Sequence, residues 1–266
     1  MAITTIPWGD GSGDNIYLSA PSQTGDQSVS VTSDPNTGAA RTKVVTFSAS
    51  GVPSVTLTIT QDGLPYTPLT YIQTDGTAYI DTGIESTSPK SCELKVLIPS
   101  ATNCAFLGKG QINTSSQNTG MFVPLAIYNS TAVFGYRFRY SSGAPSVSDS
   151  ITNQTPFIAR TRLKTGNQWI GVKQDGEESW TSLSKTQGNA PISPANMYLF
   201  RTNYTTPWQC PSGSRVYYCR IYGDYDLTTL VFDGIPCIYN GEYGLWDKVT
   251  NTFFGNAAGS GAFSGA

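Results

Sequence analysis

The segment "SDPNTGAARTKVVTFSASGVPSVTLTITQDG" (residues 33–63) decides the fold class of the chain. Its apolar residues alternate with Ser and Thr, which is the period-two pattern of half-buried antiparallel strands. Asp, Asn, Gly and Pro stand between the apolar runs, and tight turns require these residue types. The segment therefore predicts a β-hairpin with strands over Thr42–Ala49 and Val55–Gln61.

The same pattern extends over the rest of the chain. Residues 1–62 are expected to form a small, or partial, β-sandwich, and residues 63–68, with two prolines and a glycine, are the natural linker. Residues 69–266 hold several strand-like runs separated by turn signals, which favours a β-sandwich or jelly roll. No convincing amphipathic helix of about 12 residues is present. The predicted fold class is all-β, with two domains.

Composition excludes several classes of partner. Charged residues make up 13% of the chain, and the net charge is −2 without any run of Lys or Arg. Nucleic acids and anionic membranes attract clustered cations, so neither is expected as a partner. The aromatic–arginine alternation in "YRFRY" (Tyr136–Tyr140) is interpreted as a strand with aromatics inside and arginines outside. No apolar run approaches the roughly 20 residues that span a bilayer.

Cysteine and histidine limit the chemistry further. The five cysteines include no CxxC pair, and they are predicted to be buried free thiols rather than disulfides or zinc ligands. Histidine is absent, which excludes Ser-His-Asp and Cys-His mechanisms and nearly all zinc catalysis. No metal and no cofactor are expected.

The opening segment resembles the C-terminal half of the BACON domain, a β-sandwich module of gut Bacteroidetes and their phages. The resemblance rests on an Asn-Thr-Gly-x-x-Arg turn (Asn36–Arg41), the strand after it and a closing Thr-Gln-x-Gly strand (Thr60–Gly63). It covers about residues 8–63, and the first strands of a full module are missing or replaced. A partial sandwich exposes an edge or an apolar face, so we expect a partner to complete it.

The rest of the chain resembles the concanavalin A-like, laminin-G-like jelly roll over residues 66–266. The motifs are "YIQTDGTAYIDTGI" (residues 71–84) and "RIYGDYDLTTLVFDGIPCIYNGEYGLWD" (residues 220–247), in the order expected for that family. The resemblance implies two stacked antiparallel sheets with a face or rim that often binds glycans. Trp246 lies in the terminal motif and is expected to pack against the last turn.

Many proteins of this fold are glycosidases, which carry two acids at a fixed spacing. No such spacing occurs in this sequence. The acidic cluster "DGEES" (Asp175–Ser179) suits a solvated hairpin tip, and Asp224 and Asp226 are predicted to share one face of a strand, where a structural or calcium role stays open. No catalytic residue is predicted.

Glycan binding needs an aromatic plate flanked by hydrogen-bonding groups, because a pyranose has apolar faces and a polar equator. The candidate carbohydrate-binding residues are Trp208, Tyr204 and Trp180, which lie in or beside predicted loops. Trp169 competes for this role, but a core position within its hairpin is the preferred interpretation.

Three functional classes remain. The favoured hypothesis is a non-enzymatic virion protein of a Bacteroidetes phage, such as a crAss-like phage, acting as a capsid-mounted head fibre or decoration protein that adheres to host or mucus glycans. It would assemble in the host cytoplasm with other virion proteins, as a homo-oligomer for which a trimer is one arrangement. The chain starts at Met1 without an export signal, which favours this hypothesis over a secreted or surface carbohydrate-binding protein of a gut bacterium. A glycoside hydrolase is the third class.

Overall fold

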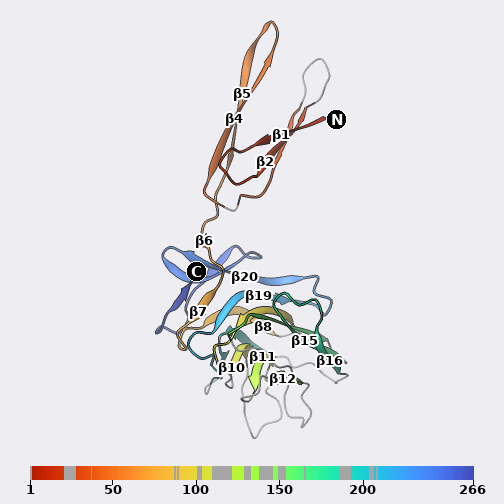
Figure 1. Ribbon diagram of the computed structural model, residues 1–266, viewed down its shortest axis with the longest axis vertical. Coiled ribbons are helices and arrows are strands. Elements are labelled where there is room, and N and C mark those ends of the chain that lie inside the picture. Colours follow the sequence, from red (N-terminus) through yellow and green to blue (C-terminus); the bar gives the residue numbers. More distant parts are fainter. Residues whose placement is uncertain are drawn as a thin grey trace. The chain divides into compact units, whose positions relative to one another are not determined.

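The computed structural model describes residues 2–20, 28–36, 38–86, 88, 90–100, 104–109, 122–128, 133–137, 146–148, 154–164, 166–185, 193–203, 207 and 209–266. The chain divides into two compact units, which we call unit 1 (Met1–Pro65) and unit 2 (Tyr66–Ala266) (Figure 1). The described residues of both are all-β and contain no helix, so no membrane-spanning helix is found among them. The predicted all-β fold class is confirmed.

Unit 1 consists of a three-stranded antiparallel sheet and a two-stranded hairpin. Its strands are β1 (Ala2–Pro7), β2 (Asn15–Ala20), β3 (Ser30–Ser33), β4 (Arg41–Ala49) and β5 (Val52–Gln61). The hairpin β4–β5 is the one predicted from the sequence, although β5 begins three residues earlier than expected (Figure 1). The two sheets meet at a small core of Trp8, Ile16 and Leu18, against which Val45 and Ile59 pack.

Much of the apolar surface of unit 1 stays exposed. Phe47 and Val55 are cross-strand partners, two residues along from Val45 and Leu57, so they share the inner face of the hairpin. Val55 is nevertheless 66% exposed and Phe47 39% exposed. On β3, Val31 pairs with the buried Leu18 and is itself 39% exposed. The inner faces therefore carry more apolar side chains than the small core buries.

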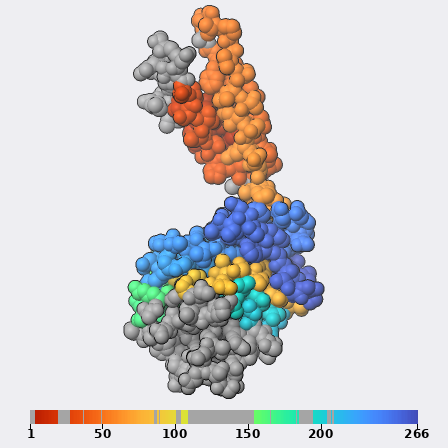
Figure 2. Space-filling view, turned by 180° about the vertical axis from the view of Figure 1, so that it is seen from behind, coloured from red at the N-terminus to blue at the C-terminus, as the bar shows by residue number. Residues whose placement is uncertain are grey.

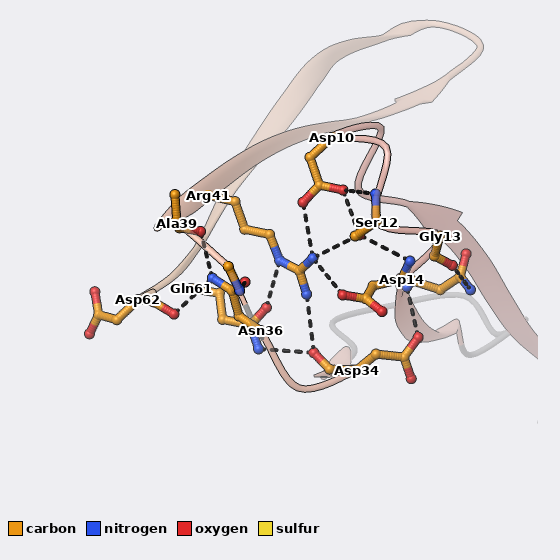
Figure 3. Close-up of polar contacts among 12 residues, drawn as sticks. Asp10, Ser12, Gly13, Asp14, Asp34, Asn36, Ala39, Arg41, Gln61 and Asp62 are labelled. Carbon is orange, nitrogen blue, oxygen red and sulfur yellow. Dashed lines mark hydrogen bonds and ion pairs between the residues drawn. The ribbon is translucent and has the colours of Figure 1, made fainter. Parts of the chain in front are cut away.

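Arg41 joins the separate parts of unit 1 (Figure 3). Its guanidinium donates to Asp10 at 3.0 Å and to Asp14 at 2.8 Å, and it lies 4.5 Å from the ring of Trp8. It also donates to Gln61 at the end of β5, at 2.9 Å. The arginine is buried, and a buried cation needs such partners to offset its lost hydration. One side chain thus ties the β1–β2 loop to both strands of the hairpin.

The turn before β4 contains the Asn-Thr-Gly-x-x-Arg motif (Asn36–Arg41), and its contacts account for the Asn and Gly positions. Asn36 donates to the carbonyls of Ala39 and Asp62, at 2.7 and 2.9 Å, and accepts from the Gly38 amide (Figure 3). A Cβ on Gly63 would stand 2.6 Å from the Ala40 nitrogen, so this position has room for glycine alone. Asn36 and Gly63 therefore hold the end of β5 close to the turn that precedes β4.

Unit 2 is a sandwich of two sheets. The first, which we call the small sheet, contains β8 (Ile80–Ser86), β10 (Cys104–Lys109), β11 (Phe122–Tyr128), β12 (Val133–Arg137), β13 (Ser146–Ser148), β17 (Ser193–Leu199) and β18 (Thr202–Asn203). Its strands run in the order β13-β12-β11-β10-β17-β8, and β18 pairs in parallel with β10.

The second, or large, sheet runs in the order β16-β15-β14-β9-β19-β20-β21-β22. Its strands are β6 (Thr67–Pro68), β7 (Ile72–Thr74), β9 (Ser91–Leu97), β14 (Phe157–Lys164), β15 (Asn167–Gln174), β16 (Thr181–Lys185), β19 (Arg215–Tyr222), β20 (Leu230–Tyr239), β21 (Glu242–Asp247), β22 (Thr252–Phe254) and β23 (Phe263–Gly265). The second strand of the unit, β7, pairs directly with the last, β23, and Figure 2 shows gold and blue residues side by side.

The core of unit 2 lies between the two sheets. Phe106 and Leu199 come from the small sheet, Leu94, Phe157 and Phe232 from the large one, and all belong to one buried cluster. Burial along β14 alternates residue by residue, so every second side chain faces away from the core. Side chains at such outward positions form the outer face of each sheet, and this face is accessible to a ligand.

The boundary between the units falls inside the predicted 63–68 segment, between Pro65 and Tyr66. Tyr66 is buried, with its ring 4.9 Å from that of Trp246, and Thr67–Pro68 pair with β20. These residues therefore belong to unit 2. Trp246 is buried in β21, as expected for packing of the terminal motif.

All five cysteines are free and buried, as predicted, and all lie in unit 2. They are Cys92, Cys104, Cys210, Cys219 and Cys237. Burial raises the pKa of each thiol for which a shift is resolved, to about 11 for Cys237. The thiolate forms are therefore suppressed at neutral pH.

Candidate functional site

A pair of tryptophans lies on the outer face of the large sheet. Trp169 on β15 alternates with Gln168 and Ile170, which are buried, so its side chain points away from the core. Trp180 stands immediately before β16, and the two rings meet edge to face with centroids 5.6 Å apart. Both indoles are partly exposed. The interpretation of Trp169 as a core residue is therefore wrong.

Gly171 makes room for this pair. It follows Trp169 by two residues on the same face of β15, and a Cβ there would stand 2.3 Å from Trp169 and 3.0 Å from Trp180. The indoles thus occupy the space that a side chain would fill. Together, Trp169, Gly171 and Trp180, with the cations Arg160 and Lys173, form what we call the tryptophan patch.

The cations hold the tryptophan patch in place. Arg160 on β14 lies 4.5 Å from the Trp180 ring, and Lys173 on β15 lies 5.4 Å from it. Arg160 also donates to Oε2 of Glu93 on β9, through Nε at 2.7 Å and through Nη2. The ion pair fixes Arg160 through two donors to one oxygen of Glu93, and the cation–π contact then restricts the position of Trp180.

A polar row continues from Glu93 across the large sheet. The second oxygen of Glu93 accepts from the Tyr218 hydroxyl at 3.1 Å and lies 3.5 Å from Arg220, which binds Asp233 at 3.1 Å. Burial, and then the charge of Glu93, raise the pKa of Tyr218, so this phenol stays protonated. Both oxygens of Glu93 are thus engaged by cations or a donor.

A second aromatic pair lies on the outer face of the small sheet. Tyr198 on β17 stands between the buried Met197 and Leu199, and its ring stacks on Tyr79 with centroids 4.8 Å apart and planes inclined by 27°. The guanidinium of Arg201 lies 4.4 Å from the Tyr79 ring.

Polar groups flank this second pair. Asn196 donates to Asp81, the cross-strand partner of Tyr198, at 3.3 Å. We call Tyr79, Tyr198, Arg201, Asp81 and Asn196 the tyrosine patch. Sequence reasoning missed Tyr79 and Tyr198, although the apolar–tyrosine–apolar alternation around Tyr198 predicts an outward ring.

Of the three predicted carbohydrate-binding residues, the structure describes one. Trp180 lies in the tryptophan patch, whereas Tyr204 and Trp208 lie outside the described residues and stay predictions. The ends of their loop are fixed: Asn203 donates to the Asn196 carbonyl at 3.1 Å, and Gln209 donates to that of Gly76. Trp180 belongs to the large sheet, and this loop follows β18 of the small sheet.

The acidic segments have structural roles. Residues 175–179 form an exposed hairpin tip, as predicted, and Asp175 pairs with Lys95 at 2.6 Å. The prediction that Asp224 and Asp226 share a strand face is wrong, because both lie in the turn between β19 and β20. Asp224 accepts from the Thr228 amide, which lowers its pKa to about 2.

A carboxylate–hydroxyl–carboxylate series also occurs in unit 1, in the loop "DGSGD" (residues 10–14). This spacing suits cation loops in general. Here, however, the Arg41 Nη1 donates to Asp10, Ser12 and Asp14 at once. Among the described residues, no cluster of acidic, cysteine or histidine side chains could hold a metal ion.

"YRFRY" overlaps the end of β12, which stops at Arg137, and its last three residues lie outside the described part. Its interpretation as a strand with alternating faces stays a prediction beyond that point.

Comparison with known proteins finds similarity among solved structures. No family model matches the chain, and no curated protein does. The solved structures that match include a protein of Bacteroides ovatus, described as a "putative carbohydrate binding protein", at a TM-score of 0.51 and 10% identity. The match covers 96% of this chain and 69% of the other. At this identity the likeness shows the β-sandwich fold alone.

Proposed function

We propose that the protein binds carbohydrate without transforming it, and that the tryptophan patch is the binding site. The observation that carries this proposal is the pair Trp169–Trp180, set over Gly171 on an outward, partly exposed sheet surface. Two indoles offer broad apolar plates to the C–H faces of sugars, and the neighbouring Lys173 offers a donor to ring hydroxyls. The fold shared with a Bacteroides protein described as carbohydrate binding supports the same proposal.

Binding without turnover is supported by the state of the acids near the patch. Arg160 engages one oxygen of Glu93, and Arg220 and Tyr218 engage the other, so this acid has both oxygens held by protein groups rather than presented to a ligand. A screen for release of reducing sugar from polysaccharides tests this part. We expect no release, and turnover that disappears in Glu93→Gln would contradict it.

The double variant Trp169→Ala, Trp180→Ala tests the site. We expect its retention in gels containing the polysaccharide that the wild type binds to fall sharply, because both indole plates of this site are removed. Lys248→Ala, an exposed cation on another turn, is the matched control and should bind normally. Unchanged retention of the double variant would remove the tryptophan patch from consideration. Tyr204→Ala with Trp208→Ala tests the predicted loop in the same assay.

A secreted or surface protein of a gut bacterium is the cellular setting that fits this proposal with the fewest further assumptions. Virion display, with unit 1 as the docking module, is a second candidate function. The observation that favours it is the exposed apolar surface of unit 1, which glycan binding alone does not use.

Mass spectrometry of purified phage particles and of bacterial surface fractions from one culture separates the two settings. Recovery in particles would support virion display, and recovery in the surface fraction alone would contradict it. Chemical cross-linking in the recovered fraction would report the oligomeric state, for which a homotrimer was one prediction.

A further inference from the structure

We propose that the tyrosine patch is a second glycan-binding site, so that one chain binds two sugar segments at once. The inference rests on the proposed function and extends it from one site to two. It assigns a role to the pair Tyr79–Tyr198, of which Tyr79 also packs against the core cluster, whereas Tyr198 does not belong to it.

The geometry of the pair favours a ligand. Met197 and Leu199 fill the core on either side of Tyr198, and the tyrosine ring itself projects outward and stays partly exposed. Stacking at 4.8 Å holds the two rings as a fixed pair in which Tyr198 can serve as the plate, while the Arg201 guanidinium lies over the Tyr79 ring. A pre-arranged plate loses little conformational entropy when a pyranose packs on it.

Polar groups around the plate match the equator of a sugar. Among the described residues, neither tyrosine hydroxyl forms a hydrogen bond with another group. Arg201 forms no ion pair there, and its Nε donates to the Thr202 carbonyl at 3.4 Å. Asp81 is held by Asn196 and by the Gly83 amide, which leaves a fixed carboxylate beside the rings. A carboxylate accepts from, and a guanidinium donates to, adjacent sugar hydroxyls.

This donor and acceptor set indicates the class of ligand. One carboxylate and one guanidinium give the patch no net charge to attract an anionic sugar, and each can bind a neutral hydroxyl. We therefore assign the tyrosine patch to neutral hexose units of a polysaccharide.

The two patches cannot share one sugar unit. The tryptophan patch lies on β14, β15 and the start of β16, on the outer face of the large sheet. The tyrosine patch lies on β17 and beside β8, on the outer face of the small sheet. The core separates these faces, and stacked sheets stand about 10 Å apart before side chains are added. A chain with both sites occupied therefore bridges two polysaccharide strands or two distant segments of one.

Bridging has two measurable consequences. Retention on a polymer exceeds that of either site alone, by a factor on the order of 10²–10⁴ when both sites engage together. A soluble polysaccharide should also become turbid at matched protein concentration, because each chain cross-links it.

The experiment uses the full chain and calorimetric titration with a short neutral oligosaccharide cut from the polysaccharide that gels retain. We expect two bound oligosaccharides per wild-type chain, one in Tyr198→Ala, one in Trp180→Ala and none in the double variant. Turbidity should disappear in both single variants. Tyr225→Ala, which removes a partly exposed tyrosine that contacts Lys164, is the matched control and should keep two sites. Unchanged near-UV circular dichroism and melting temperature establish that each variant is folded.

The outcomes separate this inference from the proposed function. One bound oligosaccharide in the wild type, unaffected by Tyr198→Ala, overturns the second site and leaves the proposed function intact. Loss of all binding in Tyr198→Ala, with none lost in Trp180→Ala, overturns both the two-site inference and the assignment of the first site. No retention of the wild type by any polysaccharide, neutral or charged, overturns the proposed function itself. Tyr198→Phe that keeps the second site would show that the ring, rather than the hydroxyl, carries it.

Discussion

Unit 1 and unit 2 are built from the same kind of strand but hold together differently. In unit 2 the described residues form one core cluster of 25 buried residues between two sheets, whereas the corresponding cluster of unit 1 has three. Unit 1 instead relies on Arg41, which connects the loop of residues 10–14 to the hairpin. A small domain that buries little apolar surface depends on a few specific contacts. The loss of one polar side chain should therefore matter far more in unit 1.

The largest expected effect is that of Arg41→Met. The change removes the buried group that joins the loop to the hairpin and leaves the partly exposed Asp10 and Asp14 without their cation. We expect amide exchange in β4 and β5 to accelerate at least about tenfold, as for local unfolding of a low-stability region. Exchange in unit 2 should not change. Arg41→Lys keeps the charge but loses the planar fork, and it should give an intermediate rate.

Gly171→Val in unit 2 should have a moderate effect on stability and a large one on glycan retention. The new side chain would collide with Trp169 and Trp180, and overpacking of this kind costs about 1–3 kcal/mol. Gly223→Ala, where the nearest side-chain atom stands at 3.4 Å, is the control. Urea unfolding and gel retention measure the two effects. Normal retention in a folded Gly171→Val would argue that the indole positions do not matter.

The next largest effect is expected from acid, which should destabilise unit 1 through the protonation of Asp10. Hydrogen bonds from the Ser12 hydroxyl and amide, together with Arg41, lower the pKa of Asp10 below its ordinary value of 3.8. The ionised carboxylate therefore stabilises unit 1 fully above about pH 4, and this contribution is lost as the pH falls through the lower folded-state pKa. Proteolysis at pH 5 and pH 3 should show unit 1 becoming more susceptible. In Asp10→Asn that pH dependence should be reduced, with lower stability at pH 5.

The smallest effect is expected for Val55→Thr, since Val55 is 66% exposed. Surface substitutions of this kind usually change stability by less than about 0.5 kcal/mol. The same substitution at Val216, which is fully buried in β19, places a hydroxyl in the core and should cost about 1–3 kcal/mol. Equal costs in urea unfolding would mean that Val55 is covered in solution, as docking through unit 1 requires.

The sequence predicted those features that depend on neighbouring residues. Alternation alone located β4 and the end of β5, and the lack of spacing motifs among the cysteines predicted buried thiols. The partners of Arg41 were not predictable, because Asp10 and Asp14 lie about 30 residues away and meet it only after folding. Asp224 was misplaced because an acidic turn and an acidic strand share the same local composition.

The candidate site was predicted only in part, because the contacts between its residues depend on strand pairing and on which face of a strand points outward. Trp180 was identified as a ring near a hairpin tip, but its contact with Trp169 depends on which face of β15 points outward. The buried neighbours Ile170 and Val172 carry that information, since alternation with them places Trp169 outside. The stack of Tyr79 on Tyr198 joins residues more than 100 positions apart, and only the pairing of β8 with β17 brings them together.

The distribution of cysteines gives the protein a built-in reporter. Every thiol is buried in unit 2, and unit 1 has none. A thiol-reactive dye can therefore label the chain only when unit 2 opens, and the labelling rate measures that opening separately from any event in unit 1. A ligand that engages either outer face of the sandwich should slow the labelling, so the same chemistry can be used to screen glycans without introducing an engineered cysteine.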